Sequence, residues 1–150
     1  MTSDTNSLRD IEAIKRLKAR YFRAMDTQQW DELRACFTED LEADFRDAPG
    51  MLSHGRDNYL AELKPILEHS TTIHHGHMPE IVLLGANEAT GVWAMDDIVI
   101  LPDMTLQGWG HYHERYRREA GEWRIAAVKL TRLRLLINGE EQSLGTSANG

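Results

Sequence analysis

The sequence contains a single cysteine, Cys36, among 150 residues, so no internal disulfide bond can form. Cys36 lies inside the helical pattern WDELRACF, where we expect it to pack as a small hydrophobic residue rather than to act as a nucleophile. The sequence also lacks any apolar run near the about 20 residues of a membrane span, and its polar start, MTSDTNSLRD, lacks a signal-peptide core. We therefore expect a cytoplasmic protein with no membrane partner.

Positive charge is scarce, because 17 Lys and Arg stand against 24 Asp and Glu, giving a formal net charge of -7. The acidic residues are spread along the chain, so we expect no nucleic-acid partner. The sequence has no glycine-rich nucleotide loop, no Gly-x-Ser-x-Gly elbow and no Cys-x-x-Cys pair, which favours a cofactor-free reaction. The composition is typical of one domain, which we place at residues 1–137, followed by a polar and mobile tail at 138–150.

Helical patterns fill the first part of the chain. Apolar residues recur at steps of three and four in SLRDIEAIKRLKARYFRAMD, starting at Leu8, which predicts a long amphipathic helix. TQQWDELRACF predicts a short helix and LEADFRD a strand. GRDNYLAELKPILEH predicts a third helix, interrupted near Pro65 because proline lacks a backbone donor and clashes with the preceding turn.

Strand patterns follow residue 70: TIHHGHMPEIVLLG, EATGVWAMDDIVIL, LQGWGHYHERYRRE and EWRIAAVKLTRLRLL. The short connections between them indicate an antiparallel meander. Helices followed by a meander predict an α+β domain, in which a curved antiparallel sheet wraps round the N-terminal helices. Such an arrangement leaves an internal pocket, which is the default place for a small-molecule site.

Histidines cluster on two of these strands. Because side chains alternate across a strand, His75 and His77 share one face with His74 on the other, and His111 and His113 also share a face. Two His-x-His pairs could bind a metal ion. The strand VWAMDDIVIL runs between them, however, and separates the pairs by two strand spacings of about 4.8 Å each. We therefore expect no metal site and assign these two pairs to a polar outer face or a subunit contact.

Three polar residues are out of place in their patterns. Asp96 and Asp97 interrupt an apolar run, and alternation lets only one of them face the pocket. Asp26 ends the long helix, where the helix dipole disfavours a carboxylate. It could cap the second helix, or a functional role could explain it.

The segments IKRLKARYFRAMDTQQWDELRACFTEDLEADF, TIHHG and HERYRREAGEWRIA resemble the SnoaL-like group of the nuclear-transport-factor-2-like superfamily, over about residues 8 to 135. This group includes scytalone dehydratase, bile-acid 7α-dehydratase and hexachlorocyclohexane dehydrochlorinase. The resemblance implies a cone-shaped α+β barrel with a pocket between the helices and the sheet. It also implies homo-oligomers, dimers or trimers, formed through the outer sheet face.

The resemblance further implies a set of catalytic residues. The aspartate that ends the first helix in this group matches Asp26, and the histidine that starts a later strand matches His74. A neutral histidine can take a proton from carbon, and a buried carboxylate fixes its tautomer and stabilises the imidazolium. Two further site residues of the bile-acid dehydratase match Tyr21, which would protonate a leaving hydroxyl or polarise a carbonyl, and Asp97, which would orient that tyrosine or hold a substrate hydroxyl.

Positions at which this sequence differs from members of the group narrow the range of expected substrates. Met25 and Phe45 stand where scytalone dehydratase has tyrosines, which argues against scytalone. The dehydrochlorinase has a lysine at the position that matches Tyr21 and a pocket arginine at the position that matches Val128. These differences argue against hexachlorocyclohexane as the substrate of this protein. Arg132 and Arg134 on the last strand could bring positive charge to the pocket, although such arginines more often face solvent.

We expect seven apolar or aromatic residues to line or border the pocket, each of which is singly also a common core residue: Phe22, Met25, Phe45, Trp93, Met95, Tyr112 and Tyr116. Such walls fit a small hydrophobic polycyclic or aromatic molecule. The leading hypothesis is a cofactor-independent lyase of dehydratase type. The alternatives are a ketosteroid-isomerase-like or polyketide-cyclase-like enzyme, and a non-catalytic ligand-binding module or the small subunit of a ring-hydroxylating dioxygenase.

Overall fold

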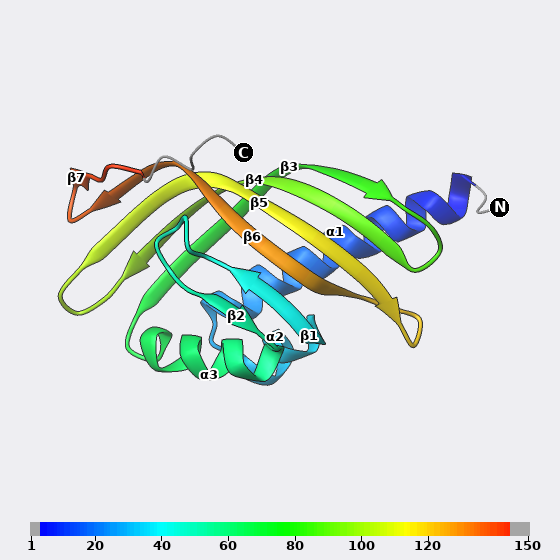
Figure 1. Cartoon of the computed structure of the whole chain (residues 1–150), viewed down its shortest axis with the longest axis horizontal. Coiled ribbons are helices and arrows are strands. Elements are labelled where there is room, and N and C mark those ends of the chain that lie inside the picture. Colours follow the sequence, from blue (N-terminus) through cyan, green and yellow to red (C-terminus); the bar gives the residue numbers. More distant parts are fainter. Residues whose placement is uncertain (1–3, 145–150) are drawn as a thin grey trace.

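The computed structural model describes residues 4–144, in which helices pack against a strongly twisted sheet (Figure 1). The helices are α1 (Asp4–Asp26), α2 (Trp30–Ala35) and α3 (Arg56–Leu67). The strands are β1 (Phe37–Asp44), β2 (Leu52–His54), β3 (Thr71–Leu83), β4 (Glu88–Ile100), β5 (Thr105–Glu119), β6 (Glu122–Ile137) and β7 (Glu140–Glu141).

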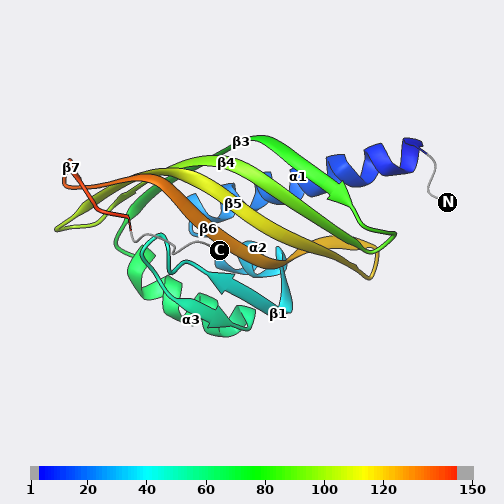
Figure 2. The ribbon, with the colours of Figure 1, turned by 45° about the horizontal axis from the view of Figure 1, so that its top comes forward.

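The strands form one sheet in the order β2-β1-β6-β5-β4-β3, and β7 pairs with β6. Strands β3 to β6 form the predicted antiparallel meander. Strand β1, however, lies parallel to β6, so the sheet is mixed rather than wholly antiparallel. The sheet is curved and does not close, with β2 and β3 at its described edges (Figures 1 and 2). The α+β cone predicted from the sequence is confirmed.

Helix α1 packs on the inner face of the sheet through the stripe predicted from its periodicity. Ile14, Leu17, Tyr21 and Met25 are all at most 3% exposed. Leu8, predicted to begin this stripe, is 67% exposed, because the N-terminal end of α1 extends beyond the body of the molecule (Figure 1). The stripe therefore starts later than the sequence pattern indicates.

Helix α3 is not interrupted near Pro65, contrary to the prediction. It continues through this residue to Leu67. Pro65 lies in the last turn, so its missing N–H removes one hydrogen bond and leaves the earlier turns intact. The first part of the predicted tail is also ordered, since Glu140–Glu141 forms β7 against β6. Residues 145–150 of that tail lie outside the described residues.

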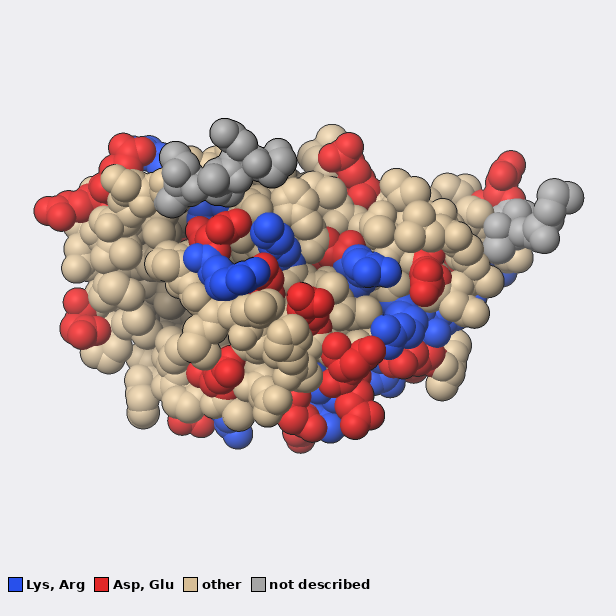
Figure 3. Space-filling view, viewed as in Figure 1, with Lys and Arg blue, Asp and Glu red and all other residues tan. Residues whose placement is uncertain are grey.

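The surface carries both signs of charge. Acidic and basic side chains are interspersed on the face shown in Figure 3. The exposed ion pairs of the molecule include Arg117–Asp40 and Arg34–Asp57. Between residues 4 and 144, none of the helices is both long and apolar enough to cross a membrane.

Candidate active site

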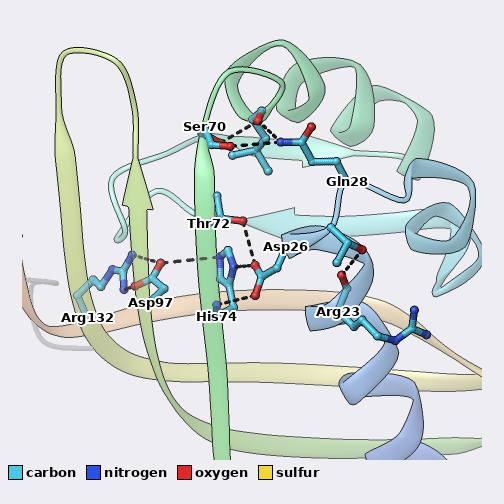
Figure 4. A network of polar contacts seen from close by, with 10 residues as sticks. Arg23, Asp26, Gln28, Ser70, Thr72, His74, Asp97 and Arg132 are labelled. Atoms are coloured by element: carbon cyan, nitrogen blue, oxygen red, sulfur yellow. Dashed lines mark hydrogen bonds and ion pairs between the residues drawn. The ribbon is translucent and has the colours of Figure 1, made fainter.

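Asp26 and His74 meet at the end of α1 and the start of β3 (Figure 4). One carboxylate oxygen of Asp26, Oδ1, lies 2.7 Å from His74 Nδ1 and accepts a hydrogen bond of 2.9 Å from the Thr72 hydroxyl. The other oxygen, Oδ2, accepts the backbone N–H of His74 at 2.9 Å. Thr72 and His74 are two positions apart on β3 and therefore share the face that meets Asp26. The carboxylate thus fixes both the ring and the backbone of His74.

The three donors offset the unfavourable position of Asp26 at the C-terminal end of α1. Asp26 does not cap α2, because the residue before that helix is Gln29 and no side chain caps it. The turn after Asp26 is anchored by Gln28, whose amide donates to the backbone carbonyl oxygens of Leu67 at 2.7 Å and Ser70 at 3.3 Å. This anchor links the end of α1 to the connection between α3 and β3, as Figure 4 shows.

Asp97 is the inward member of the aspartate pair. It is the direct cross-strand partner of His74, and the pairing of β3 with β4 is regular from Thr71 to His77. Its carboxylate lies 4.0 Å from His74 Nε2, which is too far for a hydrogen bond. Arg132 on β6 donates two hydrogen bonds to it, of 2.6 and 3.1 Å. The Arg132 and Asp97 side chains are only 3% and 5% exposed, so this is a buried bidentate ion pair.

Gly108 makes this ion pair possible. It pairs with Asp97 across the sheet and lies on β5, between the strands that carry Asp97 and Arg132. A Cβ atom at this position would overlap the Arg132 guanidinium and would stand 2.9 Å from Asp97 Oδ1. The missing side chain therefore leaves the space in which the arginine crosses over β5. The sequence pattern left the orientation of Arg132 open and gave no signal for Gly108.

A β-bulge separates Arg132 from Arg134. The pairing of β5 with β6 shifts by one residue, so that Gly110 is opposite Arg132 whereas the adjacent Trp109 is opposite Arg134. The extra residue, Leu133, is 69% exposed. Because one extra residue reverses the alternation of side chains, Arg132 points inward while Arg134 is exposed and pairs with Glu141.

The site faces a cavity of about 250 Å³. Its lining is mainly apolar and comes from α1, α3, the β1–β2 segment and the inner sheet face. The lining residues are Tyr21, Met25, Phe45, Ala48, Pro49, Gly50, Met51, Ser53, Tyr59, Glu62, Leu63, Ile66, Leu67, His74, Asp97, Val99, Leu106, Tyr112, Leu130 and Arg132. Met51 and Ile66 are 54% and 55% exposed, so the cavity opens to solvent between the β1–β2 segment and α3.

Tyr21 lines the cavity and is 1% exposed. Burial, with a smaller contribution from the neighbouring Tyr112, raises the pKa of Tyr21 well above its ordinary value. Burial likewise raises the pKa of Tyr112. Both phenols therefore stay protonated at neutral pH, and each can serve the cavity as a hydrogen-bond donor.

Three of the seven expected lining residues, Met25, Phe45 and Tyr112, line the cavity. The other four lie outside its lining. The Phe22 ring stacks on the His74 ring with centroids 6.3 Å apart, and Met95 contacts Arg132 through its sulfur atom.

Trp93 and Tyr116 belong to a buried polar chain that the sequence analysis missed. Trp93 Nε1 donates to the Tyr116 hydroxyl at 2.9 Å, which donates to Glu114 at 2.8 Å. Glu114 forms an ion pair of 2.9 Å with Lys18 of α1, and both side chains are fully buried. Two sequence signals could have found this pair, since Lys18 interrupts the apolar stripe of α1 and Glu114 shares the inward face of β5 with Tyr112.

The outer sheet face carries the two predicted histidine pairs, His75 with His77 and His111 with His113. Asp96 contacts His75 at 3.4 Å and His77 at 2.7 Å, and these side chains are between 37% and 60% exposed. His113 lies 3.1 Å from the Thr131 hydroxyl. Within residues 4–144, no group of three or more histidine, cysteine or acidic side chains is arranged to hold a metal ion.

The structure therefore defines an α+β cone with an inward His–Asp pair in a mainly apolar cavity. The family model of the SnoaL-like domain matches residues 6–129 of this chain. The chain therefore belongs to the SnoaL-like family. The resemblance inferred from the sequence is thus confirmed.

Solved structures share the fold. A candidate scytalone dehydratase from Novosphingobium aromaticivorans superposes with a TM-score of 0.82 at 22% identity, over 96% of this chain and 97% of its own. A type 2 hexachlorocyclohexane dehydrochlorinase superposes with a TM-score of 0.80 at 19% identity, over 90% of this chain and 93% of its own. A Mycobacterium tuberculosis protein of unknown function superposes with a TM-score of 0.77 at 25% identity, over 89% of this chain and 78% of its own.

Proposed function

We propose that this protein is a cofactor-independent lyase of dehydratase type, acting on a small hydrophobic aromatic or polycyclic alcohol. The observation that carries the proposal is the orientation of His74. Its Nδ1 is held by Asp26, and its Nε2 is directed toward Asp97 at the cavity, where no residue between 4 and 144 hydrogen bonds to it. A histidine held in this way is a general base whose reactive nitrogen is open to a ligand.

The reaction removes the elements of water from adjacent carbons. His74 Nε2 takes a proton from the carbon next to a carbonyl group, and the C–H electron pair forms an enolate. The enolate collapses to a carbon–carbon double bond as the C–O bond of the β-hydroxyl group breaks. The leaving hydroxide receives a proton from Tyr21, which is then restored by the proton on His74.

Asp26 and the Asp97–Arg132 pair have distinct parts in this scheme. Asp26 stabilises the imidazolium that forms on His74, as the carboxylate does in hydrolytic triads. Asp97 accepts a hydrogen bond from the substrate hydroxyl, while Arg132 pairs with this buried carboxylate and fixes its position. General-base assistance of this kind contributes about 10²- to 10⁴-fold to the rate.

Two features favour an enzyme over a non-catalytic module of the same fold. The cavity of about 250 Å³ is not filled by side chains. The Asp26 carboxylate is turned toward His74, and its side chain is only 22% exposed. A purely structural histidine would not require an open, charged site at the end of an apolar cavity.

The test is turnover of a panel of bicyclic and polycyclic β-hydroxy ketones, with products analysed by mass spectrometry. The wild type converts at least one compound to the product that has lost one water molecule. His74→Ala lowers kcat by at least about 10²-fold, whereas the matched control His75→Ala, on the outer face, keeps wild-type turnover. Equal turnover by His74→Ala and wild type would refute the assignment of the base.

The same panel separates elimination from a proton shift. An isomerase or cyclase would use the same base but would produce a compound of unchanged mass. A product that has lost water, formed only when His74 is present, supports the dehydratase assignment. A product of unchanged mass would instead assign the protein as an isomerase or cyclase.

A further inference from the structure

A second polar pair lines the cavity at a distance along the chain from the His74 site. Ser53 on β2 donates a hydrogen bond to Oε2 of Glu62 on α3, and both residues belong to the cavity lining. Ser53 is 4% exposed and Glu62 is half-buried, so this pair forms part of the cavity wall, from which Glu62 also reaches solvent. The two polar sites lie on β2 and β3, which are the opposite edges of the sheet.

The charge on Glu62 is not balanced by a neighbouring base. The other acid in the lining, Asp97, is neutralised by Arg132, and His74 is paired with Asp26 outside the lining. Among residues 4–144, the only side chain that hydrogen bonds to Glu62 is Ser53, whose neutral hydroxyl contacts one of the two carboxylate oxygens. The other oxygen therefore remains available as an acceptor.

A ligand that fills the cavity would remove water from this carboxylate. Burying an ionised carboxylate without a hydrogen-bond donor is costly, and an apolar ligand would bring no donor. A second anion close to Glu62 would be repelled. The cavity volume adds a size limit, because 250 Å³ is below the range of about 300–1,000 Å³ for sites that hold drug-sized ligands. The space fits one or two rings better than four.

We propose that Ser53 and Glu62 form a specificity site that selects one- or two-ring substrates carrying a second hydroxyl or amino group at the end away from His74. The inference rests on the proposed function for the identity of the reacting end. At the other end, Glu62 accepts a hydrogen bond from the substrate, and Ser53 holds the carboxylate in place. Substrates with a carboxylate at that end are rejected.

The experiment measures binding rather than turnover, by titration calorimetry of the full chain. The probes are naphthol, a series of naphthalenediols that differ in hydroxyl spacing, and hydroxynaphthoic acids. The wild type is expected to bind at least one diol about 10-fold or more tightly than naphthol, the size of a hydrogen bond to a charged group. Hydroxynaphthoic acids of the same spacing bind more weakly than that diol.

Two variants of Glu62 should change ligand preference in ways that a structural role would not produce. Glu62→Leu abolishes the preference for the diol, and Glu62→Gln weakens it while improving binding of the hydroxynaphthoic acid. Glu68→Gln, an exposed site next to the end of the same helix, leaves all affinities unchanged. Thermal unfolding of each variant identifies any that fails to fold, in which case the Glu62→Gln comparison alone decides.

Either of two results overturns the inference: no diol is preferred by the wild type, or the preference survives in Glu62→Leu. His74→Ala keeps the two proposals apart, because it should retain the diol preference. If the preference is present and depends on Glu62 but no elimination is found, the specificity site stands and the proposed reaction fails.

Discussion

Asp26 holds His74 through two different groups, its backbone N–H at 2.9 Å and its ring Nδ1 at 2.7 Å. A carboxylate accepts hydrogen bonds and cannot donate them when ionised, so the ring nitrogen that faces it carries the proton. The neutral imidazole therefore has its lone pair on Nε2, the nitrogen that faces Asp97. This tautomer is required for a base that acts toward the cavity.

The tautomer is directly measurable by long-range ¹⁵N–¹H correlation spectroscopy. We expect the neutral form of His74 to show a protonated Nδ1 and an unprotonated Nε2. In Asp26→Leu the ring loses this acceptor, and the spectrum should move toward the Nε2–H tautomer that is favoured in free histidine. A wild-type spectrum with the proton on Nε2 would be incompatible with the proposed base.

Gly108→Ala should separate Arg132 from Asp97, because the added methyl group occupies the path of the guanidinium. The separation leaves a buried carboxylate unpaired, so we expect a loss of about 3 to 5 kcal/mol in the free energy of unfolding, measured by urea denaturation. Gly85→Ala is the control, since a Cβ there meets no atom within 4 Å. Equal stability of the two variants would show that Arg132 does not need this gap.

The buried pair of Lys18 and Glu114 should dominate the stability of the contact between α1 and β5. Burial lowers the pKa of Lys18, although the partner carboxylate of Glu114 acts in the opposite direction. The ammonium also lies over the rings of Tyr21 and Tyr112, at 4.0 and 3.6 Å from their centroids. Removing it exposes Glu114 to an apolar interior with no counter-charge.

We therefore expect Lys18→Met to lower the free energy of unfolding by about 3 to 5 kcal/mol. Lys15→Met, on the exposed side of the same helix, should change it by less than about 0.5 kcal/mol. The double variant Lys18→Met with Glu114→Leu should lose less than Lys18→Met alone, because no charge is left behind. A double variant less stable than both single ones would contradict this account.

The Asp40 carboxylate provides a test of surface electrostatics. Arg117 donates two hydrogen bonds to it, of 2.9 and 3.2 Å. These bonds, with a smaller contribution from Thr38, lower the pKa of Asp40 from 3.8 to about 2. Because the folded pKa is the lower one, the stabilisation is present above pH 3.8 and is lost as the pH falls toward 2. Carboxyl ¹³C titration should give this pKa in the wild type and a higher value in Arg117→Ala. An unchanged pKa in the variant would remove Arg117 as the cause.

The sequence predicted the faces of single strands better than the contacts between strands. Alternation on β3 correctly separated His74 from His75 and His77, because it depends only on local geometry. The choice between Asp96 and Asp97 needed the register with β3, which no local pattern contains.

The same limit applies to the last strand. Arg132 and Arg134 are two positions apart and would share a face in a regular strand, so only the bulge at Leu133 explains why they point to opposite sides. Gly108 has no side chain with a chemical signal of its own, and its importance appears only once Arg132 crosses above it. Pro65 shows a different limit, because the effect of proline depends on how many turns of helix follow it.

The central claim, that His74 is a carbon base, is tested most directly by proton exchange without a leaving group. A bicyclic ketone such as tetralone is incubated in D₂O, and incorporation of deuterium next to the carbonyl is followed by NMR. We expect the wild type and His75→Ala to accelerate exchange equally and His74→Ala to reduce the acceleration by about 10²-fold or more. Exchange that is equally fast in His74→Ala and the wild type would contradict the assignment of His74 as the base.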